Sequence, residues 1–192
     1  MKKRLKTTAM VLCVMLVLSG CSSSAMSETE LMQLPSYTIE GSFSYDTSDL
    51  RQVIGFAKYV FVAEVISYDG SRLEDVAYRE DEKQGKVKLG SPYTDYTVRV
   101  TENIKGQLKI NETLKIKKDG GLAPDGESVY VWENDELPRT GETYVFCATQ
   151  ETDGTLLVCG PSSNVLVSSG REKETIDKYK KAYADQIIPK EE

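Results

Sequence analysis

The stretch YVFVAEVISY at residues 59–68 and the stretch YTVRV at residues 96–100 decide the fold class of this chain. The first is dense in β-branched and aromatic residues, which predicts a central strand covered on both faces. The second alternates between apolar and polar residues, which predicts a strand with one buried face that turns at Lys105-Gly106. We therefore expect a sheet at the centre of the domain.

Further short strands and two helices are predicted around these stretches. Asp49 supplies N-cap chemistry for a short amphipathic helix that begins at Leu50. Ser169 and Glu172 have the spacing of a capping box for a C-terminal helix, and its apolar stripe is Ile176, Tyr179 and Tyr183. Alternation and turn residues predict the remaining strands at residues 113–117, 129–132, 143–148, 155–159 and 164–167.

Residues 69–91 interrupt this series. They carry several glycines and the charged run Glu80-Asp81-Glu82-Lys83, which predicts a long polar loop. Six or seven short strands with turns between them are typical of a small antiparallel barrel. We predict a mainly β fold: an OB-like barrel of six or seven strands, with a short helix before it and a helix after it.

The N-terminus has the features of an export signal. A basic start is followed by an apolar run too short to span a bilayer comfortably. Leu18-Ser19-Gly20-Cys21 then resembles the bacterial lipobox, which implies that the Cys21 thiol receives a diacylglyceryl group. We expect attachment to the cell membrane through lipid on Cys21, on the side facing away from the cytoplasm. The alternative is an uncleaved N-terminal anchor helix.

The predicted domain organisation follows from this signal. Residues 1–20 form the signal peptide, residues 21–45 hold the lipidated cysteine and a Ser-rich tether, and residues 46–192 form the barrel domain with its C-terminal helix. Tyr37, Ile39, Phe43 and Tyr45 alternate with other residues, so the distal half of the tether has an alternative as an edge strand of the domain.

Composition excludes several kinds of function. The chain contains no histidine, so it has neither a Ser-His-Asp or Cys-His catalytic pair nor a zinc or iron site built on His ligands. Without the signal peptide, 20 Lys and Arg stand against 30 Asp and Glu, a net charge of −10. Such a surface repels phosphate backbones, so we expect no nucleic-acid partner. The carboxylates lack calcium-loop spacing, and we predict no metal, no cofactor and no catalytic residue.

Cys147 and Cys159 are the two cysteines left after lipidation and signal removal. A two-residue hairpin loop at Asp153-Gly154 would put them on opposite faces of the sheet. A three-residue loop, with Gly154 in the left-handed conformation, would put them directly opposite each other. We predict the second arrangement and a cross-strand disulfide, with two free buried thiols as the alternative.

Four stretches carry a resemblance to a known group of proteins. Residues 48–167 resemble surface lipoproteins of Gram-positive bacteria whose domain is similar to the netrin-like, OB-type barrel of metalloproteinase inhibitors. The resemblance implies a barrel fold and is best marked at Lys105-Gly106 and Gly120-Gly121, which are also ordinary turn residues. Its stretches are AKYVFVAEVISY (57–68), YTDYTVRVTENIKG (93–106), ETLKIKKDGG (112–121) and GETYVFCA (141–148).

Two classes of function stay open at this stage. We expect a non-enzymatic envelope module that binds a protein, peptide or glycan through residues 69–91 and 119–128, because rigid barrels leave recognition to their loops. The alternative is an enzyme that acts on cell-wall glycan with carboxylates alone. Trp132 has a second interpretation as a core residue. The possible binding surface comprises Tyr93, Lys105, Gly120, Gly121, Tyr130 and Trp132.

The anchor is directly testable. We expect the wild-type protein to fractionate with membranes and Cys21→Ala to lose both the lipid and the lipobox processing, because the thioether needs the Cys21 sulfur. Cys13→Ala, inside the apolar run, is the matched control and should be processed normally. Membrane fractionation and mass spectrometry of the mature N-terminus provide the measurement. A wild-type N-terminus without a lipid mass on Cys21 would contradict the anchor.

Overall fold

The structure, a computed structural model, describes residues 26–189, which form nine strands and three helices. The helices are α1 (Glu28–Leu31), α2 (Leu50–Phe56) and α3 (Glu172–Ala184). The first strands are β1 (Ser36–Ile39), β2 (Tyr59–Asp81), β3 (Gly85–Lys105), β4 (Thr113–Asp119) and β5 (Gly121–Leu122). The last are β6 (Val129–Trp132), β7 (Thr143–Gln150), β8 (Leu156–Val158) and β9 (Asn164–Leu166).

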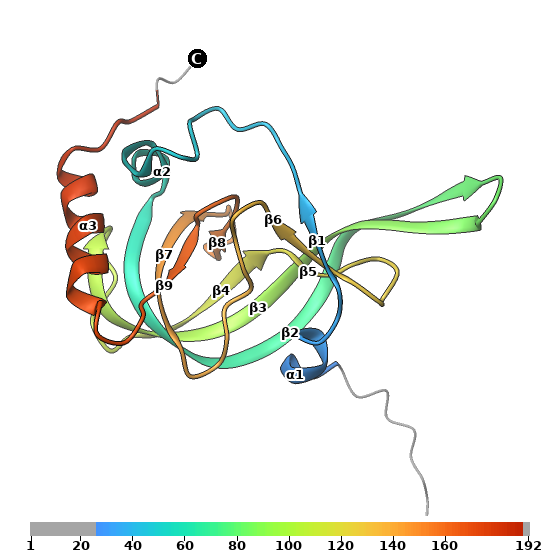
Figure 1. Cartoon of the computed structure of the whole chain (residues 1–192), viewed down its shortest axis with the longest axis horizontal. Helices are drawn as coiled ribbons and strands as arrows, with labels where there is room; N and C mark the ends of the chain where they lie inside the picture. Colours follow the sequence, from blue (N-terminus) through green and yellow to red (C-terminus); the bar gives the residue numbers. More distant parts are fainter. Residues whose placement is uncertain (1–25, 190–192) are drawn as a thin grey trace, which may run out of the picture.

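Five strands close into a barrel in the order β2-β3-β4-β8-β7, and β7 pairs back onto β2 (Figure 1). The pairings are antiparallel except β4–β8, which is parallel. β9 pairs with the first part of β7, on the same edge that β8 pairs with further along, while β1, β6 and β5 form a second, three-stranded sheet. The predicted mainly β barrel, with a short helix before it and a C-terminal helix, is confirmed.

The central strand β2 is covered on both faces, as predicted. Phe61, Ala63 and Val65 point into the barrel and are fully buried there against apolar residues of β3, β4, β7 and β8. Val60 and Val62 point outward and are buried under α2 and α3. Figure 1 shows these two helices on the same side of the barrel. Alternate residues of β2 therefore belong to two separate apolar clusters.

The two predicted helices are present, but the N-cap predicted for the C-terminal helix is wrong. The Asp49 side chain accepts a hydrogen bond from the backbone N–H of Arg51, which caps α2. α3 is capped at Arg171 without a side-chain hydrogen bond, so Ser169 is not its N-cap. Gly170, with φ +82°, turns the chain first, and the helix begins two residues later than a Ser169 cap requires. The apolar stripe of α3 packs on the barrel as expected.

The prediction of a polar loop at residues 69–91 is wrong. β2 and β3 continue through it as one long antiparallel hairpin, paired from Gly70 opposite Asp95 to Asp81 opposite Gly85. Figure 1 shows the hairpin extending away from the barrel. Because both faces of its distal part lie in solvent, its residues do not need to alternate between apolar and polar types. Arg72 instead pairs with Glu74 and Asp95.

Residues 26–45 pack on the barrel, so the edge-strand alternative describes this segment better than a free tether does. α1 carries a capping box between Ser27 and Glu30. Leu31 is fully buried with Val129 and Leu137. β1 then pairs in parallel with β6. Leu31 and Tyr45 of this segment thus find apolar partners on the domain, whereas Tyr37 is largely exposed.

Cys21, the lipobox and the signal peptide lie outside the described residues. Within residues 26–189, none of the helices is long and apolar enough to cross a membrane.

The packing of residues 26–45 predicts a local effect of Leu31→Ala. Removing a buried leucine side chain costs about 2–5 kcal/mol, and here most of that loss should fall on the docking of α1 and β1. We expect hydrogen exchange of the amides of residues 27–39 to accelerate at least tenfold, while the barrel amides stay protected. Gln33→Ala, at an exposed position, is the control. Equal exchange in both variants would mean that Leu31 does not hold the segment.

Candidate functional site

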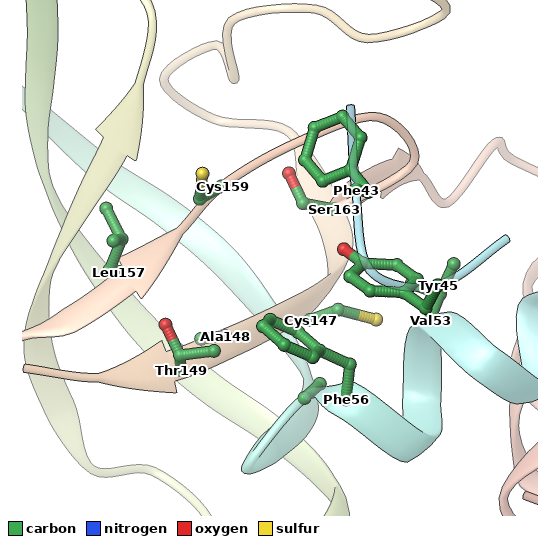
Figure 2. A pocket seen from close by; sticks show the side chains of 11 residues that line it. Phe43, Tyr45, Val53, Phe56, Cys147, Ala148, Thr149, Leu157, Cys159 and Ser163 are labelled. Atoms are coloured by element: carbon green, nitrogen blue, oxygen red, sulfur yellow. The ribbon is translucent and has the colours of Figure 1, made fainter. Parts of the chain in front are cut away.

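An apolar pocket of about 220 Å³ lies between α2, β7 and the segment that follows β1. Figure 2 shows aromatic rings and two cysteines around it. None of the side chains that line it carries a charge at neutral pH. The lining residues are Phe43, Tyr45, Val53, Phe56, Ala57, Cys147, Ala148, Thr149, Leu157, Cys159 and Ser163.

Three aromatic side chains form one wall of this pocket. The Tyr45 and Phe56 rings stack with their centroids 4.6 Å apart. Phe43 contacts the edge of Trp132 at a centroid distance of 5.3 Å. Phe56 is 45% exposed, which places it at the pocket entrance. This wall comes from the N-terminal segment and α2, so the pocket exists only while that segment is docked.

Cys159 and Trp132 share one carboxylate oxygen at the other side of the pocket. The Cys159 thiol and the indole N–H of Trp132 both donate to Oδ2 of Asp119, at 2.9 Å and 2.8 Å. Burial, together with the hydrogen bond to Asp119, raises the pKa of the Cys159 thiol to about 12. The thiol therefore stays protonated near neutral pH and is a poor nucleophile.

Cys147 is buried on the outward face of β7, in the cluster that α2 and α3 cover. Burial raises the pKa of its thiol to about 12. Both thiols of the pocket are therefore apolar groups under ordinary conditions, and they add to its hydrophobic lining.

The predicted disulfide is absent: Cys147 and Cys159 are both free in the structure. The three-residue loop that was expected to align them is present, since Glu151 N–H donates to the Thr155 carbonyl and Gly154 has φ +93°. However, β8 ends at Val158.

The bend that follows β8 separates the two thiols. Gly160, with φ +85°, turns the chain towards β9. The Cys147 N–H donates at 2.7 Å to the carbonyl of Ser163, so this residue replaces Cys159 as its neighbour. Figure 2 shows the sulfurs of Cys147 and Cys159 pointing in different directions.

A buried ion pair supports the pocket from behind. Lys118 and Asp135 form this pair, and both side chains are 1% exposed. The Lys118 ammonium also donates to the hydroxyl of Ser163, a pocket residue, at 3.1 Å. Burial raises the pKa of Asp135, and Lys118 opposes that rise. Alternation along β4 places Lys118 on the same face as the buried Ile116, and its contact with Asp135 from a distant segment explains why a charged side chain is tolerated there.

Five of the six residues predicted as a binding surface lie near one another in the structure, and Lys105 lies apart from them, against α2. Tyr93 lies opposite Asp119 in the β3–β4 pairing, with the Lys117 ammonium 4.5 Å from its ring centroid. Trp132 meets the same Asp119 and adjoins the pocket. Tyr130 pairs with Tyr37 of β1 on one side and with Gly121 of β5 on the other.

Lys105, Gly120 and Gly121 have structural roles. The Lys105 ammonium donates to the Ile54 carbonyl, at the end of α2, at 2.7 Å. Gly120 and Gly121 have φ +118° and +144°. A Cβ on Gly120 would lie 2.8 Å from the Tyr130 carbonyl oxygen, so side chains are excluded there. Apart from Cys147 and Cys159, which were assigned to a disulfide from the sequence, the pocket residues were not predicted, although Phe43 and Tyr45 belong to the alternating pattern of residues 37–45.

No protein-family model and no curated protein matches this chain. Within residues 26–189, no three His, Cys, Asp or Glu side chains are grouped so that they could hold a metal ion. The arrangement of the pocket is suited to holding an apolar group out of water. The Asp119 carboxylate contacts the Cys159 thiol, but the raised pKa values of both pocket thiols keep them protonated near neutral pH, which makes them poor nucleophiles.

The buried thiols predict a distinctive pH dependence of alkylation. An ordinary cysteine has a pKa of about 8.5, so its alkylation rate levels off above that pH. Because both pocket thiols have a pKa of about 12 in the folded protein, their rates should keep rising about tenfold per pH unit between pH 9 and 11. Iodoacetamide labelling followed by mass spectrometry of the two peptides measures this. Unfolded protein is the control. A plateau near pH 9 in the alkylation rates of the folded protein would contradict the burial of the two thiols.

Proposed function

We propose that this protein is a non-enzymatic, lipid-anchored binding module of the bacterial cell envelope, facing outside the cytoplasm. It holds an apolar side chain of a protein or peptide partner in the pocket between α2 and β7. The observation that carries the proposal is the pocket itself, which is open to solvent and lined without charge. Apolar pockets rimmed by aromatic residues are typical anchor sites for protein partners.

The size of the pocket supports a single anchoring side chain. Drug-sized ligands occupy pockets of about 300–1,000 Å³, and a cavity of about 150 Å³ holds benzene. A volume of about 220 Å³ lies between these values. One aromatic or branched aliphatic side chain fits this volume, and such burial contributes about 1.5–3 kcal/mol.

The chemistry of the lining favours binding over catalysis. Glycoside hydrolysis needs two carboxyl groups on either side of the scissile bond, and the pocket has no acidic side chain among its lining residues. Sugar hydroxyl groups would also find few polar partners there. A protein or peptide partner is therefore favoured over a glycan, and over the carboxylate enzyme considered from the sequence.

Two features of the sequence support the cellular setting. The lipobox at residues 18–21 would attach the exported chain to the membrane. The resemblance to netrin-like surface lipoproteins of Gram-positive bacteria agrees with the same location and with a barrel domain.

The β2–β3 hairpin, which extends from the barrel into solvent, is the second contact surface that we propose for the partner.

A pocket-filling variant tests this function. Thr149→Phe should place a ring where the anchor side chain would sit, and should abolish partner binding. Phe56→Ala removes the exposed wall ring and should weaken binding about tenfold, while Ile110→Ala, at a 62% exposed position outside the pocket, should have no effect. Pull-down of envelope proteins with each full-length variant measures retention, and thermal midpoints confirm folding.

Two results would overturn the binding module. One is retention of the same partner by the wild type and a folded Thr149→Phe. The other is release of product from a cell-wall polymer by the wild type that stops when a single Asp or Glu is replaced, which would establish the carboxylate enzyme.

A further inference from the structure

We propose that the outer edge of β1 binds a short, extended, basic peptide segment as an additional strand. This site is separate from the pocket between α2 and β7 and goes beyond the function proposed above.

The hydrogen-bonding pattern of β1 leaves one edge open. The carbonyls of Pro35 and Ile39 accept from the N–H groups of Val129 and Glu133 at 2.9 Å and 3.3 Å, so alternate residues of β1 face β6. The backbone N–H and C=O of Thr38, between them, therefore point the other way. β1 is the end strand of its sheet, and no other described strand pairs with this edge.

β1 also lacks the features that usually protect an edge strand. Proteins block exposed edges with lysine, proline or a bulge. Residues 36–39 contain no lysine and no proline, and their pairing with β6 has no break in register. Pro35 before the strand and Gly41 after it limit the open edge to a few residues. A partner strand of about four to six residues would therefore satisfy it.

A groove on the sheet face over β1 and the start of β6 has room for side chains that an added strand directs across β1. Its volume is about 600 Å³, and it is lined by Tyr37, Thr38, Ile39, Glu40, Asp125, Ser128 and Tyr130. Tyr37 is 57% exposed and lies opposite Tyr130 in the β1–β6 pairing. The groove therefore offers the Tyr37 ring next to the open backbone and the Tyr130 ring one strand further away. In strand addition, backbone bonds provide affinity and such side-chain sites provide selectivity.

The charge of the groove selects a basic segment. Glu40 and Asp125 are its only ionisable residues besides the two tyrosines, and Lys and Arg are absent from the lining. Backbone N–H groups of Glu127 and Ser128 donate to the Asp125 carboxylate, which lowers its pKa and keeps it negative. Asp125 is bonded to Ser128, which lies near the start of β1, whereas Glu40 follows the end of β1. Lys or Arg side chains near the two ends of the added strand would therefore each meet one carboxylate. A glutamate-bearing segment would be repelled.

Three acetylated octapeptide probes separate strand addition from plain charge attraction. They are an alternating Thr-Lys peptide, the same peptide with Glu in place of Lys, and the Thr-Lys peptide with two central Thr residues replaced by Pro. We expect the full-length protein to bind the first in fluorescence anisotropy at low salt. The Glu peptide should not bind, and the Pro peptide should bind at least tenfold more weakly because it cannot pair along the edge.

Variants of β1 locate the site. Thr38→Pro removes the outward N–H and should weaken binding of the Thr-Lys peptide at least tenfold, while Thr38→Val keeps that N–H and should bind normally. Glu40→Gln should weaken binding several-fold and reduce its salt dependence. Thr149→Phe, which fills the pocket, should leave this binding unchanged, so a failure of the pocket proposal would be distinguishable from a failure here.

The proposal fails if the Thr-Lys peptide does not bind, or if the Pro peptide or a folded Thr38→Pro binds equally well. If Thr38→Pro does not fold, hydrogen exchange on the wild type decides. The Thr-Lys peptide should slow exchange of the Thr38 amide at least tenfold, and unchanged exchange would overturn strand addition at β1.

Discussion

The structure depends on the pairing of one strand, β2, with two partners at once. Its first half pairs with β3 on one edge and with β7 on the other, which closes the sheet. Closure removes exposed edges from the barrel and gives β2 an inner and an outer apolar face. The outer face carries α2 and α3, and the pocket forms where α2 meets β7. The pocket therefore depends on barrel closure and on the packing of α2 against the outer face of the closed barrel.

Residues with one or two buried faces were predictable from the sequence, because burial imposes a pattern. The strand at residues 96–100, the core of β2 and the helix after Asp49 each follow such a pattern and are confirmed. The distal hairpin was missed because both of its faces are solvated. There, cross-strand contacts such as Lys86 over the Tyr78 ring stabilise the pairing, and such contacts leave no periodic signal.

The candidate site was less predictable because it depends on contacts between distant segments. The loop at residues 152–154 was derived correctly, yet the strand it leads into ends at Val158 for reasons that lie in Gly160 and β9. Hairpin pairing rules do not predict where a strand ends when a third segment pairs with the same backbone groups. Tyr45 stacks on Phe56 only after the N-terminal segment docks, so neither could be assigned to a site beforehand.

The buried Lys118–Asp135 pair shows what maintains this arrangement. Removal of one partner from a buried pair costs about 3–5 kcal/mol, because the other charge is left unpaired. Here the pair joins β4 to the chain between β6 and β7, and it contacts Ser163 in the pocket lining. It therefore stabilises one arrangement of three chain segments rather than adding generally to stability.

The docked N-terminal segment has a consequence for where this protein would act. Met26, the first residue that the structure describes, already packs near Leu31 and Val129, and it lies only five residues beyond the proposed lipid site Cys21. A fully extended chain covers about 3.3–3.6 Å per residue, so the barrel would stay within roughly 20 Å of the lipid headgroups. The reach of the molecule would then be set by its own dimensions and by the hairpin, and partners accessible to it would be those close to the bilayer.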